Sequence, residues 1–220
     1  MNILSTLVLL WGFLGATVAW AADTKEAGPV STEAVWKPGP SSVADIKKQC
    51  AASGGGSFQD CFIDGMAKAG ASPQAVAFTR SHDGAYLRDF RRVGPVDIAH
   101  VTNPFRANEN DSVFLVNGKP ATIDVDNQKL LTEADLTKNP TYAALAKKYP
   151  QISLWPGDRY GTNTPVVKDL PGGDRRFVAS YRLRNSCHAC AVIGSAQFGF
   201  DFDQDGKFMG TKLLQVTASQ

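Results

Sequence analysis

Apolar residues recur at helical spacing in the first part of the chain. Two segments have this spacing, and each begins with a helix-start signature. The signature is Ser42 with Asp45 in the first segment and Ser57 with Asp60 in the second. A Ser in this position accepts a hydrogen bond from an N–H that the first turn of a helix leaves unpaired. We therefore expect helices that begin at Ser42, at Ser57 and at Ser72-Pro73, the last of them ending near Arg80.

Further along, apolar and polar residues alternate with a period of two, which is typical of a half-buried strand. The segment from Val113 to Val125 predicts a hairpin, because Asn117-Gly118 supplies the two positive φ angles of a type I′ turn. Three later runs predict a meander with a turn at Asp205-Gly206; they are Arg175 to Arg184, Ala196 to Phe202 and Phe208 to Val216.

Between the hairpin and the meander, Thr132 to Tyr149 has a helical pattern that is interrupted near Asn139-Pro140 and ends before Pro150. A short strand is expected from Ile152 to Trp155. The order of elements predicts an α+β fold, with N-terminal helices followed by an antiparallel sheet and a C-terminal meander. We expect the apolar face of the meander to pack on the amphipathic helices upstream.

The first 21 residues predict export. Ile3 to Val18 is a mostly apolar stretch without charge, and Ala19-Trp20-Ala21 is a small-x-small cleavage site. An uncleaved anchor is the alternative, because the amine of Met1 is the only positive charge before the apolar stretch. We divide the chain into a signal peptide (1–21), a flexible arm rich in Pro and Gly (22–40) and a single α+β domain (41–220). No later segment has the ~18 consecutive apolar residues of a membrane span, so we expect a periplasmic or secreted protein.

Composition and charge narrow the function classes. The chain has 220 residues, of which 43% are hydrophobic and 20% charged, which excludes a coiled coil, a collagen and a disordered acidic tail. Its 23 basic and 21 acidic side chains are dispersed and leave a net charge of +2, so no basic stripe predicts a nucleic-acid partner.

The four cysteines form two local pairs, Cys50 with Cys61 and Cys187 with Cys190. Three pairings are possible, and in an oxidising compartment we favour the local one. Cys50 and Cys61 lie on the apolar faces of two expected helices, on either side of the turn Gly54-Gly55-Gly56. We expect this disulfide to stabilise the fold by lowering the conformational entropy of the unfolded chain, and to have no further role.

Asp201, Asp203, Asp205 and Gly206 match the opening of a calcium-binding loop. The closing position of such a loop is a Glu, and here it is Lys212. The preceding segment also has a strand pattern where an entering helix is required. We therefore favour a hairpin turn in which Asp201 and Asp203 face the arginines of the preceding strand, and keep weak calcium binding as the alternative.

Only three histidines are present, His82, His100 and His188. The chain has neither a Gly-x-Ser-x-Gly elbow nor a His-Glu-x-x-His motif. We interpret His82, in an expected turn, and His100, in an expected short strand, as ordinary surface or edge residues. We expect neither an enzyme nor a cofactor.

The segment Cys187-His188-Ala189-Cys190 is the strongest candidate site. Haem attachment needs a His directly after the second Cys, where this chain has Ala191, and a structural zinc ion needs more ligands. A thioredoxin-like centre needs its first Cys at a helix N-terminus, whereas this pair connects two expected strands. What remains is a disulfide-closed loop that presents His188, and a purely structural bond is an equal alternative.

This region resembles the inhibitor-of-vertebrate-lysozyme family, secreted bacterial α+β proteins that block a lysozyme active site with a disulfide-closed loop carrying a histidine. The shared pattern covers roughly a fifth of the chain, and its loop departs from the family, which has a longer loop with Lys-Pro before the His. The matching positions are the strand Tyr181 to Arg184, Cys187, His188, Cys190, the strand Phe198 to Phe202, the turn Asp205-Gly206, and Phe208-Met209-Gly210.

The resemblance implies an exported, non-enzymatic binding protein, with a lysozyme as a candidate protein partner. Its contact residues would be Cys187, His188, Ala189 and Cys190. Two other classes stay open: a periplasmic thiol-disulfide redox protein that uses Cys187 and Cys190, and an envelope-associated structural domain.

Overall fold

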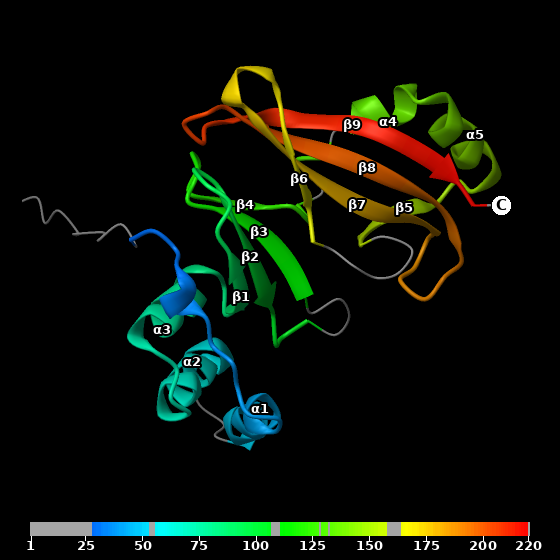
Figure 1. The fold of residues 1–220 in the computed structure, drawn as a ribbon. Coiled ribbons are helices and arrows are strands. Elements are labelled where there is room, and N and C mark those ends of the chain that lie inside the picture. Colours follow the sequence, from blue (N-terminus) through cyan, green and yellow to red (C-terminus); the bar gives the residue numbers. More distant parts are fainter. Residues whose placement is uncertain are drawn as a thin grey trace, which may run out of the picture.

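The computed structural model describes residues 28–52, 56–106, 111–127, 129–131, 133–157 and 164–219. The predicted signal peptide (1–21), the first residues of the predicted arm (22–27) and the Gly54-Gly55 part of the predicted turn lie outside the described residues. The fold is α+β, as the sequence predicts, with helices first and a strand meander last (Figure 1). None of the helices in the described ranges has the length and apolar content needed to cross a bilayer.

Three helices follow the first described segment: α1 (Ser42–Ala52), α2 (Phe58–Lys68) and α3 (Pro73–Ser81). The predicted starts of α2 and α3 are confirmed by their caps, since Ser57 Oγ accepts from Asp60 N at 3.3 Å and Ser72 Oγ accepts from Ala75 N at 3.0 Å. The Cys50–Cys61 disulfide joins α1 to α2, with 5.7 Å between the two Cα atoms. The three helices form a small apolar cluster with Trp36 and Tyr86.

The first sheet is antiparallel and has the order β1-β2-β3-β4. Its strands are β1 (Tyr86–Arg91), β2 (Asp97–Thr102), β3 (Asp111–Val116) and β4 (Thr122–Asp124). Successive side chains of a strand point to opposite faces, and both faces of the inner strands β2 and β3 are largely buried. One face packs on α3 and the 3₁₀ helix η1 (Thr32–Ala34), and the other faces the second sheet.

The second sheet contains the predicted meander, with the order β5-β7-β8-β9 and β6 paired to β7. Its strands are β5 (Ile152–Pro156), β6 (Val166–Asp169), β7 (Arg175–Asn185), β8 (Val192–Phe202) and β9 (Phe208–Ala218). The helices α4 (Glu133–Lys138) and α5 (Pro140–Lys148) connect the two sheets, and the 3₁₀ helix η2 (Pro171–Gly173) connects β6 to β7. The predicted interruption at Asn139-Pro140 is confirmed, because Asn139 caps α5.

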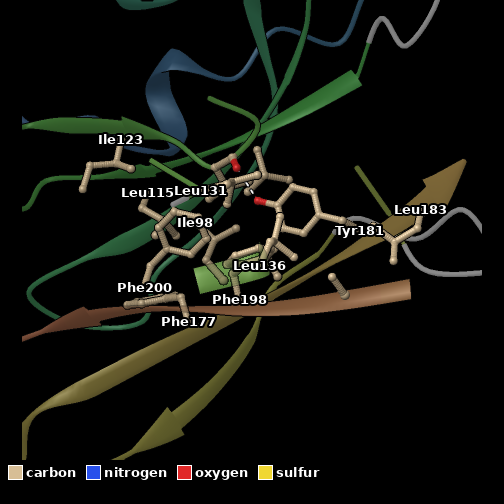
Figure 2. Close-up of a cluster of buried hydrophobic side chains, with 14 of the residues drawn as sticks. Ile98, Leu115, Ile123, Leu131, Leu136, Phe177, Tyr181, Leu183, Phe198 and Phe200 are labelled. Atoms are coloured by element: carbon tan, nitrogen blue, oxygen red, sulfur yellow. Dashed lines mark hydrogen bonds between the residues drawn. The ribbon is translucent and has the colours of Figure 1, made fainter. Parts of the chain in front are cut away.

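The main core lies between the two sheets (Figure 2). Phe177 and Tyr181 of β7 and Phe198 of β8 are fully buried there, opposite residues of the first sheet and of α4 and α5. The expectation that the meander packs on the upstream helices is therefore correct only for α4 and α5. The N-terminal helices pack on the first sheet instead, because strands β2 and β3 are apolar on both faces and need cover on both.

The predicted β3–β4 hairpin is present, but its turn is not the type I′ turn expected. The connection comprises residues 117–121, and only Asn117, with a φ of 68°, is left-handed in the Asn117-Gly118 pair. Gly118 is needed for another reason. A Cβ atom there would lie 2.8 Å from the carbonyl oxygen of Gly206, in the turn between β8 and β9. Lys119 N donates to the same oxygen at 2.8 Å, so this connection joins the two sheets.

Residues 30–36, within the predicted flexible arm (22–40), contact the core. Ala34 and Trp36 are buried, and Trp36 N donates to Leu87 O at 2.9 Å. The Asn117 side chain holds the same segment, since its Oδ1 accepts from Val30 N at 2.7 Å and its Nδ2 donates to Val30 O at 2.8 Å. Pro and Gly in the segment indicated an open chain, but two apolar side chains and these hydrogen bonds attach it to the core.

Candidate functional site

The candidate loop connects β7 to β8 at one end of the second sheet. Cys187 and Cys190 form a disulfide with 5.0 Å between their Cα atoms, which confirms the local pairing. Cys190 N donates to Cys187 O at 3.0 Å and closes a tight turn inside the ring. Ser186, just before the ring, has a φ of 82°, a left-handed conformation that is uncommon for a residue other than Gly.

Strand β5 supports the loop from one side. The ring of His188 lies edge-on to the ring of Trp155, with 4.9 Å between their centroids. Trp155 Nε1 donates to Ser153 Oγ at 2.8 Å, and the Ser153 hydroxyl donates to the carbonyl oxygen of Ser186. His188 is consequently half-buried.

Strand β7 supports the loop from the other side, where Arg184 Nη1 donates to Cys190 O at 2.6 Å. The loop is thus held by a disulfide, by an internal turn and by side chains of two neighbouring strands. Of the four predicted contact residues, Cys187 and Ala189 are exposed, whereas His188 and Cys190 are half-buried. All four lie in one tight loop at the surface.

Trp155, Ser153 and Arg184 are the site residues that sequence reasoning missed. The sequence places Trp155 in a strand and His188 in a loop, 33 positions apart, and carries no local signal that they meet. The contact arises because β5 pairs antiparallel with β7, with Ser153 opposite Arg184 and Trp155 opposite Arg182. This register brings the beginning of β5 to the end of β7, where the loop starts.

The surroundings of Cys187 do not resemble those of a dithiol oxidoreductase. The pair follows a strand and precedes a strand, so no helix N-terminus lies at Cys187 to stabilise a thiolate. Within the described part of the chain, no group of three or more His, Cys, Asp or Glu side chains is arranged to hold a metal ion.

Asp201, the first residue of the possible calcium-binding loop, already pairs with two basic side chains. Arg176 Nε donates to Asp201 Oδ1 at 2.6 Å, and Lys212 Nζ lies 3.1 Å from Asp201 Oδ2. Asp203 accepts from the main-chain N–H groups of Asp205 and Lys207 and so closes the turn before β9. The arrangement is a strand hairpin, and Asp201 faces an arginine of β7 as expected. Asp203 was expected to face the arginines too, but its carboxylate accepts hydrogen bonds within the turn.

The other two histidines are more enclosed than the surface or edge residues expected. His82 ends α3, stacks on Phe78 with 4.1 Å between ring centroids and lies 3.3 Å from Thr122 Oγ1 through its Nε2. His100 lies in β2, an interior strand of the first sheet. Burial lowers the pKa of each imidazole, although the Phe78 carbonyl and Asp83 act against the shift at His82 and Asp89 acts against it at His100.

Comparisons of the chain with protein-family models, with curated proteins and with solved structures found no match.

Proposed function

We propose that the protein is an exported, non-enzymatic binding protein whose contact element is the loop 186–190, and that its partner is a lysozyme. The single observation that carries this proposal is the way His188 is held: its ring stands at the tip of a disulfide-closed turn and against Trp155. A loop that is ordered before binding loses little conformational entropy when a partner docks.

The chemistry of His188 fits the partner class. A glycosidase cleft contains a pair of carboxyl groups, and an imidazole N–H can donate a hydrogen bond to a carboxylate. Cys187 and Ala189, the chain neighbours of His188, are exposed and so lie open to a partner. The two disulfides also support the exported location, since such bonds form and persist in oxidising compartments.

The test is inhibition of lysozymes of different types by the parent and by loop variants. His188→Ala should lose about 1 kcal/mol of folding stability, because the half-buried ring contacts Trp155. It should also lose most of the inhibition, because truncating an interface anchor costs about 2 kcal/mol or more in affinity. Cys187→Ser with Cys190→Ser should weaken inhibition by loosening the loop. Gln204→Ala is the matched control, since Gln204 is exposed in the turn at the opposite end of β8.

The proposal is contradicted if the parent inhibits no lysozyme, or if His188→Ala inhibits as well as the parent. Thiol-disulfide exchange can be measured with a dithiol reductant and a disulfide substrate. Activity of the parent in this assay would favour the redox alternative.

A further inference from the structure

Two residues that face each other across β5 and β7 attach both limbs of the loop 186–190 to the second sheet. Ser153 is directly paired with Arg184, on strands that run side by side in Figure 1, and such pairs share one face of a sheet. The Ser153 hydroxyl donates to the carbonyl oxygen of Ser186, in the limb before the disulfide. Arg184 Nη1 donates to the carbonyl oxygen of Cys190, at the other limb. We call Ser153 and Arg184 the loop clamp.

The disulfide and the loop clamp constrain different things. The Cys187–Cys190 bond joins residues three positions apart, and Cys190 N donates to Cys187 O inside the same ring. Both interactions fix the shape of the ring, but neither connects the ring to a strand. At the base of the loop, Asn185 N donates to Ala191 O at 3.1 Å and pairs the two limbs. The direction of the ring relative to the sheet therefore depends on the side chains that reach it from β5 and β7.

The Ser153 hydroxyl also holds the aromatic ring that His188 contacts. A hydroxyl group has one hydrogen, which Ser153 donates to Ser186 O, and lone pairs, which accept from Trp155 Nε1 at 2.8 Å. The Trp155 ring in turn lies edge-on to the His188 ring. Ser153, Trp155 and His188 are all half-buried. One hydroxyl group thus fixes both the limb before the disulfide and the surface on which the imidazole packs.

We propose that Ser153 and Arg184 are the positioning residues of the binding loop. The loop clamp directs His188 relative to the sheet, whereas the Cys187–Cys190 bond sets the shape of the ring. The inference rests on the proposed function for its effect on binding, because it takes His188 to be the contact residue. A loop that moves before binding loses more conformational entropy when a partner docks, so loss of the clamp should weaken binding without touching a contact residue.

The first readout is NMR spectroscopy of the free protein. Protons of the His188 and Trp155 rings should show a nuclear Overhauser effect in the parent, because the ring centroids are 4.9 Å apart. Ser153→Ala should remove this effect and shift the indole N–H resonance of Trp155, because the indole loses its acceptor. Trp155→Phe identifies that resonance. Ser153→Thr keeps the hydroxyl group and suits a strand, so it should restore both signals.

The second readout is lysozyme inhibition. Ser153→Ala should inhibit about tenfold more weakly than the parent, which is within the range for a lost hydrogen bond. Ser153→Thr should inhibit like the parent. Arg184→Gln removes the other half of the loop clamp and should change both readouts in the same direction as Ser153→Ala. Thermal melting shows which variants fold, and Arg184→Gln carries the test if Ser153→Ala does not.

Ser180→Ala is the matched control. Ser180 is a half-buried serine of β7 in the same sheet, and its hydroxyl accepts from Gln197 Nε2 at 3.4 Å. This variant should keep both the ring contact and the inhibition of the parent.

The outcomes separate this inference from the proposed function. The inference is overturned if Ser153→Ala folds and keeps the contact between His188 and Trp155. It is also overturned if Ser153→Ala inhibits like the parent while His188→Ala does not inhibit. If the parent inhibits no lysozyme but Ser153→Ala still loses the ring contact, the positioning role is upheld and the lysozyme proposal alone fails.

Discussion

The guanidinium of Arg176 and the carboxylate of Asp201 form a two-point ion pair across β7 and β8, with Nε–Oδ1 and Nη2–Oδ2 distances of 2.6 and 2.8 Å. Lys212 of β9 contacts the same carboxylate. The Asp201 side chain, which is 3% exposed, therefore connects three strands. The pair depends on Gly199, because a Cβ atom there would lie 2.6 Å from Arg176 Cδ.

Removing the charge of Asp201 should destabilise the meander. Asp201→Asn leaves Arg176 without its anionic partner, and weakening hydrogen bonds between charged groups costs about 1 to 3 kcal/mol. Asp205→Asn, in the exposed turn that follows, is the control and should change the free energy of unfolding by less than about 0.5 kcal/mol. Urea denaturation of both variants checks this. Equal midpoints for Asp201→Asn and the parent would show that the pair contributes nothing.

The same pair gives a direction for acid unfolding. Burial raises the pKa of Asp201, but the hydrogen bonds from Arg176 and Lys212 outweigh it, so the net pKa lies below the ordinary value. A carboxyl group whose pKa is lower in the folded state stabilises the fold at any pH above its pKa in the unfolded chain, about 3.9. This contribution is lost as the pH falls below that value. Between pH 5 and 3, Asp201→Asn should therefore lose less stability than the parent does.

Calcium should leave the melting temperature unchanged. Asp201 already pairs with two cations, Asp203 accepts main-chain N–H groups, and the position that should close a calcium loop is Lys212. A ligand that binds only the folded state raises the melting temperature. A rise in the presence of millimolar calcium that disappears in Asp203→Ala would show that the turn binds the ion.

Stability should fall as the pH drops from 7 to 5, because two enclosed imidazoles have lowered pKa values. The unfolded chain takes up protons near pH 6.5, whereas burial keeps His82 and His100 neutral to lower pH in the folded chain. The stability present above pH 6.5 is therefore lost on acidification. His82→Gln should flatten this dependence in denaturation experiments at pH 7 and pH 5. An unchanged slope would mean that His82 titrates alike in both states.

The disulfide between Cys50 and Cys61 should be the more stabilising of the two. Its cysteines are 11 positions apart and join two helices, so Cys50→Ala with Cys61→Ala should lower the free energy of unfolding by about 3 kcal/mol. Cys187→Ser with Cys190→Ser opens a ring with a separation of only 3 and should cost less. Thermal denaturation of the two double variants compares them. A larger loss for the second pair would contradict the loop-length argument.

Asn117 should control whether the segment 28–40 stays on the core. Asn117→Gly preserves the left-handed backbone but removes the hydrogen bonds to Val30 and the bond from Nδ2 to Asp97. We expect faster cleavage of this segment by a non-specific protease and a loss of about 1 to 3 kcal/mol, because Asp97 is buried. Cleavage at the parent's rate would show that Asn117 is not needed to hold the segment.

The sequence by itself determined the local structure. Capping residues marked the starts of α2 and α3, Asn139-Pro140 marked the break before α5, and period-two alternation marked β7 and β8. Both disulfides were predictable because each joins residues close in the sequence, where few alternatives compete. These features follow from hydrogen bonding and side-chain direction within a few residues, which a single chain segment carries in full.

The tertiary structure alone decided which segments meet. Trp155 lies against His188 only because of the β5–β7 register. The packed segment around Trp36 and the second role of Asn117 likewise depend on partners far along the chain. Alternation states which residues face the same way within one strand, but it contains no information on the register between strands that are not neighbours in sequence.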